Sequence, residues 1–76
     1  MTNSKLLSKA IEDSGLKIGW ILDSMGIKAY ATLRDKIENK REFTASEITR
    51  LCEILCLDKD QREAIFFATD AELHSA

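Results

Sequence analysis

The residues of this chain whose types and spacing could do chemistry are a group of basic residues that lie close together. Residues 27–41 hold five basic residues against two acidic ones, a local charge balance of +3. Lysine and arginine side chains at such density suit a polyanion, because they neutralise phosphates and release their counterions. An ordinary solvated helix face is the alternative explanation. The basic residues are Lys28, Arg34, Lys36, Lys40 and Arg41.

A metal site or an enzyme active site finds little support. Cys52 and Cys56 are four residues apart in a helical pattern, on one face beside Leu51 and Leu55, where buried free thiols are expected. A zinc site needs about four nitrogen or sulfur ligands, and the single histidine, His74, lies near the chain end. The sequence has no glycine-rich phosphate loop. We therefore expect no metal, no cofactor and no enzymatic activity.

The composition is typical of one small soluble domain. Of the 76 residues, 45% are hydrophobic and 32% are charged. A chain of this length can bury one core but not two, so we expect a single domain over residues 1–76, with a tail that frays from about residue 69. No apolar run reaches the length of a signal peptide or a membrane span, and a cytoplasmic location without membrane contact is expected.

The excess of acidic residues behind the formal net charge of -2 lies in the second half of the chain. Residues 1–26 carry three basic and three acidic residues, whereas residues 42–76 carry three basic residues against eight acidic ones, a balance of -5. Acidic residues on the far side of the domain lie beyond a Debye length of about 8 Å from a ligand at the basic segment. The net charge therefore does not exclude binding to DNA.

Five helices are expected to position these residues. Apolar residues recur three and four apart, proline is absent and glycine occurs only three times. Such a pattern favours helices, and no segment alternates as a strand does. The expected helices run over about residues 4–14, residues 18–25, Lys28 or Ala29 to Glu38, Thr44 or Ser46 to Leu57, and Asp58 or Lys59 to Ala68.

Capping residues mark several helix ends. Ser4 is the expected N-cap of the first helix, and Gly15 fits the left-handed position that follows its last turn. Gly26 is expected to break the second helix. The segment from Thr44 to Glu47 has the spacing of a capping box, with the side chain at one end serving the backbone at the other.

The largest apolar side chains are expected mainly in the core. Trp20 and the run from Ile65 to Phe67 are the main candidates, because side chains of this size are usually buried. Three consecutive large residues cannot share one stripe of a helix. We therefore expect Ile65 or Phe66 near the surface, as a contact between two copies of the chain.

The order of these features resembles the small phage regulators, of the Cro and repressor kind, in the lambda-repressor-like helix-turn-helix superfamily. The resemblance covers nearly the whole chain. It implies a compact all-α domain of five helices with the helix-turn-helix on helices two and three. Two short helices that meet at a glycine-containing turn suit such a motif, although plain helical hairpins also end in glycine. The segments that carry the resemblance are "GLKIGWILDSMGI", "YATLRDKIENKREF" and "TASEITRLCEILCL".

The function implied by the resemblance is that of a Cro-like repressor of a phage or prophage promoter. Such a protein binds double-stranded operator DNA as a homodimer in the cytoplasm of a bacterial host. Arg34 is the expected guanine reader, because its planar fork matches the O6/N7 edge. The implied base-contacting residues are Lys28, Tyr30, Ala31, Thr32 and Arg34. The implied phosphate-contacting residues are Lys17, Lys36, Asn39, Lys40 and Arg41, and the implied dimer interface comprises Ile65 and Phe66.

A protein-binding role is the alternative function. The acidic second half of the chain could dock on the basic DNA-binding surface of a partner phage repressor, because complementary charge steers and orients such complexes. The chain would then act as an antirepressor or modulator of repression. The sequence leaves both functions open.

Overall fold

Five α-helices make up most of the computed structural model, which describes residues 1–68. No strand occurs in that range, so the expected all-α class and the number of helices are confirmed. The expected fraying of the tail from residue 69 lies outside the described residues. None of the helices in the described part is long and apolar enough to cross a membrane. The helices are α1 (Ser4–Ser14), α2 (Ile18–Met25), α3 (Tyr30–Ile37), α4 (Ala45–Ile54) and α5 (Lys59–Phe66).

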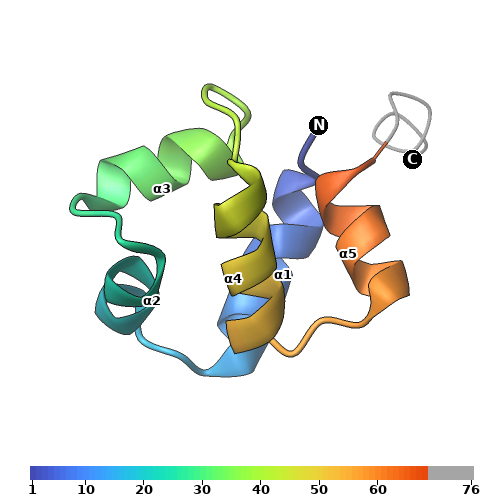
Figure 1. Cartoon of the computed structure of the whole chain (residues 1–76), viewed down its shortest axis with the longest axis horizontal. Helices are drawn as coiled ribbons and strands as arrows, with labels where there is room; N and C mark the ends of the chain where they lie inside the picture. The colour runs from blue at the N-terminus through green and yellow to red at the C-terminus, as the bar shows by residue number, and fades with distance from the viewer. Residues whose placement is uncertain (69–76) are drawn as a thin grey trace.

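The helices are arranged with α2 and α3 at one end of the long axis and α5 at the other, as Figure 1 shows. Helices α4 and α1 lie between these ends, with α4 in front of α1 in this view. Helix α1 contacts both α3 and α5, while α2 contacts α3 and α4. Helices α3 and α5 are therefore at opposite ends of the long axis, and the loop after α3 lies between them.

Side chains from all five helices meet in one core. Ile65 and Phe66 of α5 are each only 4% exposed, and the ring of Phe66 meets Phe43 edge to face at a centroid distance of 5.6 Å. Burial of each large side chain stabilises the fold by about 1.5 to 3 kcal/mol. The fully buried side chains are Leu7, Ile21, Leu33 and Leu51, one from each of α1 to α4.

Most of the expected helix ends are confirmed. Gly15 has a φ of 70° and ends α1, and Gly26 has a φ of 71° and ends α2. At the start of α4, Thr44 Oγ1 accepts from the Glu47 N–H at 3.2 Å and the Glu47 carboxylate accepts from the Thr44 N–H at 2.9 Å. The capping box is therefore complete. Asp58 caps α5 in the same way with Gln61.

The expected cap of α1 is wrong by one residue. The Asn3 side chain accepts from the Leu6 N–H at 3.2 Å, so Asn3 is the N-cap. Ser4 instead uses its hydroxyl group to donate to the carbonyl oxygen of Ile37, at the end of α3. The Ser4 side chain thus links α1 to the end of α3 and does not cap α1.

Helix α4 ends three residues earlier than expected because Cys56 has a left-handed backbone, with a φ of 54°. The Leu57 N–H then returns to the carbonyl of Cys52 at 2.9 Å, which closes the helix end as glycine usually does. Cys56 is exposed, so the expectation of two buried thiols is wrong for this residue. Cys52 is half-buried, and burial raises the pKa of its thiol.

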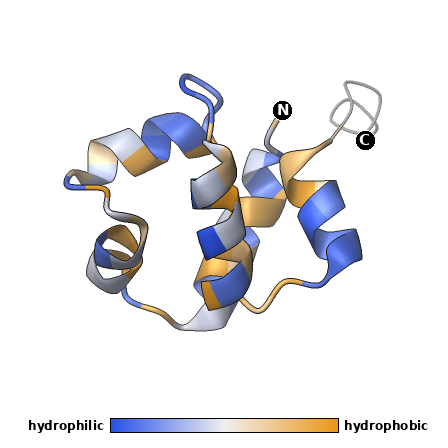
Figure 2. Ribbon diagram, viewed as in Figure 1, coloured by the Kyte–Doolittle hydropathy of each residue, from blue (hydrophilic) through white to orange (hydrophobic). Residues whose placement is uncertain are grey.

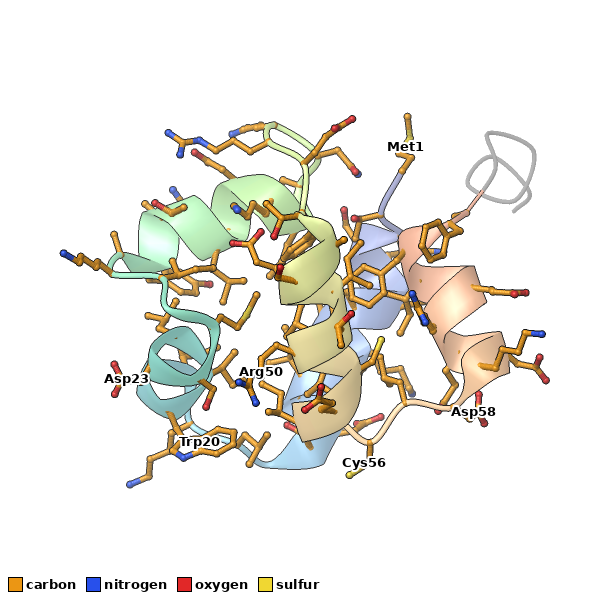
Figure 3. The ribbon with its side chains drawn as sticks, in the orientation of Figure 1. Met1, Trp20, Asp23, Arg50, Cys56 and Asp58 are labelled. Atoms are coloured by element: carbon orange, nitrogen blue, oxygen red, sulfur yellow. The ribbon has the colours of Figure 1, made fainter. Side chains whose placement is uncertain are left out.

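Two aromatic residues lie at the surface against expectation. Trp20 is 50% exposed on the outer side of α2, where Figure 3 places it near the edge of the molecule. Phe67 is 54% exposed, and the Arg62 guanidinium lies over its ring. Helix α5 ends at Phe66, so Phe67 leaves the helical path and Ile65 and Phe66 can both be buried. The expectation that Ile65 or Phe66 lies near the surface is therefore wrong.

Candidate nucleic-acid interface

The connection between α2 and α3 consists of residues 26–29 and is anchored to the core at one point. The Gly26 N–H donates to the carbonyl of Asp23 and the Ile27 N–H to that of Leu22, at 3.2 and 3.0 Å. Ile27 is 8% exposed and packs in the core cluster. Because Ile27 is held there, Lys28 leads into α3 at the surface.

The residues expected to contact bases lie on the start and outer side of α3. Leu33 is fully buried and orients the helix, so the residues on the opposite side face outward. Tyr30 is 49% exposed, and Thr32 is half-buried. The exposed members of this set are Lys28, Tyr30, Ala31 and Arg34. All five expected residues therefore present at least part of their surface to a ligand.

The loop after α3 carries two exposed residues of the expected phosphate contacts. The side chains of Lys40 and Arg41 are 66% and 61% exposed. Each has a carboxylate only at the limit of an ion pair, since Lys40 Nζ lies 3.9 Å from Glu38 and Arg41 Nε lies 4.0 Å from Asp35. Such exposed pairs contribute little and exchange readily, so both charges remain available to a phosphate.

Lys36 does not fit the expected role. Its ammonium group donates to both carboxylate oxygens of Glu47, at 2.5 and 2.7 Å, and its side chain is only 12% exposed. Burial of Glu47 opposes its ionisation, but the hydrogen bonds and the charge of Lys36 outweigh burial and lower the Glu47 pKa. The ion pair links α3 to α4 and leaves Lys36 without a free charge for DNA.

Asn39 is also engaged within the protein. Its side-chain oxygen accepts from the Thr2 N–H at 2.9 Å, and its amide group donates to the Thr2 carbonyl at 2.9 Å. Both polar ends of the Asn39 side chain are used, so the expectation of a phosphate contact does not fit this arrangement. Lys17, in contrast, is exposed at the residue that precedes α2.

The dimer contact expected at Ile65 and Phe66 does not fit the structure either. Both side chains are buried in their own core and present almost no surface to a second copy. Phe67 is the exposed aromatic residue at this end of the molecule.

Charged residues are exposed on α3, on the loop after it and on α5. Figure 2 shows hydrophilic residues through the loop after α3 and along the outer face of α5. Within residues 1–68, Lys28 and Arg34 form no ion pair. The exposed charged residues on or next to α5 are of both signs: Asp58, Asp60 and Glu63 are acidic, and Lys59 and Arg62 are basic.

The contacts that hold α3 in place were not predicted from the sequence. Thr2 and Ser4 contact residues 37 and 33 positions away, which no local pattern reveals. Glu47 was recognised as a capping residue, and its second role as the partner of Lys36 depends on how α4 packs beside α3. Arg50, outside the basic segment, reaches from α4 toward α2 in Figure 3 and lines a surface hollow with Asp23 and Gly26.

In the described part of the chain, no three His, Cys, Asp or Glu residues form a group that could hold a metal ion. The single histidine, His74, lies outside the described residues. The described residues thus form a compact helical domain with exposed basic residues on α3 and on the loop after it. Comparison of the chain with family models, with curated proteins and with solved structures finds no match to any of them.

Proposed function

We propose that this protein is a transcription regulator that binds duplex operator DNA, with α2 and α3 as a helix-turn-helix. The observation that carries the proposal is the exposed basic surface of α3 and its following loop. Lys28 and Arg34 stand there without ion-pair partners among residues 1–68, and Lys40 and Arg41 have only distant ones. Positive charges that are exposed and not neutralised within the protein favour a phosphate-rich ligand.

The shape of the segment suits the major groove. An α-helix with its side chains is about 10 to 12 Å across, which fits the major-groove width of about 12 Å, and α3 has 8 residues. In a helix-turn-helix the second helix enters the groove with its N-terminal residues against the base edges. Tyr30, Ala31 and Arg34 would then meet bases, while Lys40 and Arg41 would lie beside the backbone.

The roles divide between base reading and phosphate binding. Arg34 is the residue most suited to a guanine, and Thr32 or Ala31 to a thymine methyl group. Lys17 is at the start of α2, the helix that crosses the backbone in such motifs. Lys36 and Asn39 are left out of the proposed contacts, because their side chains are bonded within the protein. A Cro-like repressor of the lambda-repressor-like superfamily is the specific form proposed.

A binding titration with purified protein tests this function. The DNA is the intergenic region upstream of the protein's own gene, with an unrelated duplex of equal length as control, at 50 and 200 mM salt. Three phosphate contacts per copy, from Lys17, Lys40 and Arg41, predict an affinity loss of about fortyfold between these conditions. Binding to the upstream DNA should exceed binding to the control duplex. Absence of binding to both at the lower salt concentration would contradict the proposal.

An acidic modulator of a partner repressor remains the second candidate. The observation in its favour is that two exposed acidic residues of the last helix, Asp60 and Glu63, form no ion pair within residues 1–68, with the exposed Lys59 and Arg62 beside them. These acidic residues could oppose the basic DNA-binding face of a repressor. A gel shift of the neighbouring repressor, with and without this protein, distinguishes the candidates.

A further inference from the structure

Residues 2–4 join the last helix to the end of α3. The Asn3 N–H donates to the carbonyl of Ile65 at 2.6 Å, so this segment is tied to α5. On its other side, Thr2 exchanges two hydrogen bonds with the Asn39 side chain. Ser4 Oγ donates to the Ile37 carbonyl at 2.5 Å. Three successive residues thus connect two elements that are remote in sequence.

The backbone of Asn39 indicates why an asparagine matters at this point. Its φ is 65°, in the left-handed region where glycine is the least strained residue. Asparagine tolerates that region better than most residues, and it adds what glycine lacks, a side chain that can both accept and donate. Here it does both with Thr2, which is 7% exposed. The Asn39 side chain therefore links the turn to the buried Thr2.

The turn that Asn39 forms also sets the position of the basic loop. The Lys40 N–H and the Arg41 N–H both donate to the carbonyl of Asp35, at 2.8 and 3.3 Å. These bonds depend on the left-handed residue that precedes them. At the opposite end of α3, the N-cap Ala29 makes no side-chain hydrogen bond. Helix α3 is thus held by side-chain hydrogen bonds at its C-terminal end, where the loop begins.

We propose that Asn39 is a positioning residue, which works with residues 2–4 to hold the Lys40–Arg41 loop in the geometry that DNA requires. It touches no DNA itself and acts through the two basic residues that follow it. The inference rests on the proposed function. Without the Thr2 contact, α3 keeps its fold but the loop moves, so that fewer phosphates are neutralised at once.

Asn39→Gly tests the role, because glycine accepts the left-handed backbone and removes only the side-chain bonds. Cys56→Gly is the matched control: Cys56 has a φ of 54°, is exposed, and follows α4 rather than α3. At about 0.1 M salt we expect Asn39→Gly to lose about tenfold in DNA affinity and its salt slope to fall by about one unit, the effect of one lost phosphate contact. Cys56→Gly should keep the wild-type affinity and slope. An Asn39→Gly variant with wild-type affinity and slope overturns the inference.

Hydrogen exchange in the free protein separates this inference from the proposed function. We expect the Lys40 and Arg41 amides to exchange faster in Asn39→Gly, with the amide of Leu51 in the core unchanged. If the wild-type protein binds no DNA but the two amides exchange faster in Asn39→Gly, the proposed DNA-binding function is rejected. The structural link between Asn39 and the loop is then still supported. Unchanged exchange overturns the link. Ser4→Ala, which removes only the bond to Ile37, provides a second variant and should shift affinity in the same direction by less.

Discussion

Glu47 holds the ammonium group of Lys36 between its two carboxylate oxygens, at 2.5 and 2.7 Å, and so joins the fourth helix to the third. The two side chains are 15% and 12% exposed, so the pair is largely shielded from water. The same carboxylate accepts from the Thr44 N–H and completes the capping box. One residue therefore starts α4 and locates α3, the helix proposed to enter DNA.

Glu47→Gln should destabilise the protein by about 1 to 3 kcal/mol at pH 7, because a charge-assisted bond is lost while glutamine can still complete the capping box. Burial of Glu47 acts against its ionisation, but the hydrogen bonds from Lys36 and Thr44 and the charge of Lys36 lower the Glu47 pKa from its ordinary value. A pKa lowered by folding stabilises the folded state above the unfolded pKa, and this stabilisation is lost as the pH falls through the folded value. Urea unfolding at pH 7 and pH 3 should therefore show a difference between wild type and variant that shrinks at pH 3.

The matched control is Glu53→Gln. Glu53 pairs with Arg50 at 3.6 Å, but both side chains are more than half exposed. Exposed pairs contribute at most about 1 kcal/mol, so this variant should unfold close to wild type at both pH values. Equal losses from the two substitutions would show that shielding of the Lys36 pair is not what matters.

The glycines of α2 should respond to alanine in opposite directions. Gly19 lies inside the helix, and a Cβ there would meet nothing within 4 Å. Alanine at this residue should stabilise the protein by about 0.5 to 1 kcal/mol. Gly26 has equal space but a φ of 71°, so alanine there should cost about 1 to 2 kcal/mol through backbone strain. Thermal unfolding of both variants measures the difference, and the same sign for both would contradict it.

The helix ends were predictable because their causes are local. Gly15 and Gly26 end helices by their own backbone freedom, and the Thr44 to Glu47 spacing forms a capping box without help from other elements. The bounds of α1 and α2 accordingly agree with those expected from the sequence. Cys56 was missed because its left-handed backbone is unusual for a cysteine.

The candidate site was predictable only in its outline. Because Leu33 is buried, helical periodicity alone places Arg34 on the outer face. The hydrogen bonds that engage Lys36 and Asn39 come from partners in α4 and in the N-terminal segment, which the order of residues along α3 does not reveal.

Trp20 is predicted to be buried because of its size. In the structure, Ile21 of the short helix α2 is buried in the core, and Trp20 is exposed.

Phe66 and Phe67 should differ sharply under alanine substitution. Phe66 is 4% exposed and packs against Phe43, so Phe66→Ala should cost about 3 to 5 kcal/mol through the cavity it leaves. Phe67 is 54% exposed, and its loss should cost at most about 1 kcal/mol, chiefly the contact with Arg62. Chemical denaturation measures both. If the protein forms a homodimer at this end, Phe67→Ala should weaken it in light scattering, and an unaltered dimer would place the interface elsewhere.

Arg34→Ala and Lys40→Ala should affect DNA binding in different ways. Arg34 is proposed to read a guanine, so its loss should cost about 1 to 3 kcal/mol on the operator and relax the preference at one base pair. Lys40 is proposed to bind phosphate, so its loss should weaken all duplexes alike and reduce the salt slope by about one unit. Titrations on operator and unrelated DNA at several salt concentrations measure both effects. Equal losses on the two duplexes for Arg34→Ala would remove its base-reading role.

Charge reversal separates the two candidate functions. If the protein acts on DNA, Lys40→Glu with Arg41→Glu should abolish binding, because two counterion-release contributions are lost and two repulsive charges are introduced. Asp60→Lys with Glu63→Lys is the matched change on α5, where both residues are exposed, and it should leave DNA binding nearly unchanged. If the protein instead captures a basic repressor, the α5 pair should be the damaging one, through slower encounter and lost charge complementarity. Glu47 is unsuitable for this test because its reversal would break the pair with Lys36.

Gel shifts with the protein alone, and then with the neighbouring repressor added, distinguish the two functions. The modulator becomes the primary function if the protein alone shifts no DNA at low salt, and if it alters the shift of the repressor in a way that only the α5 variant abolishes.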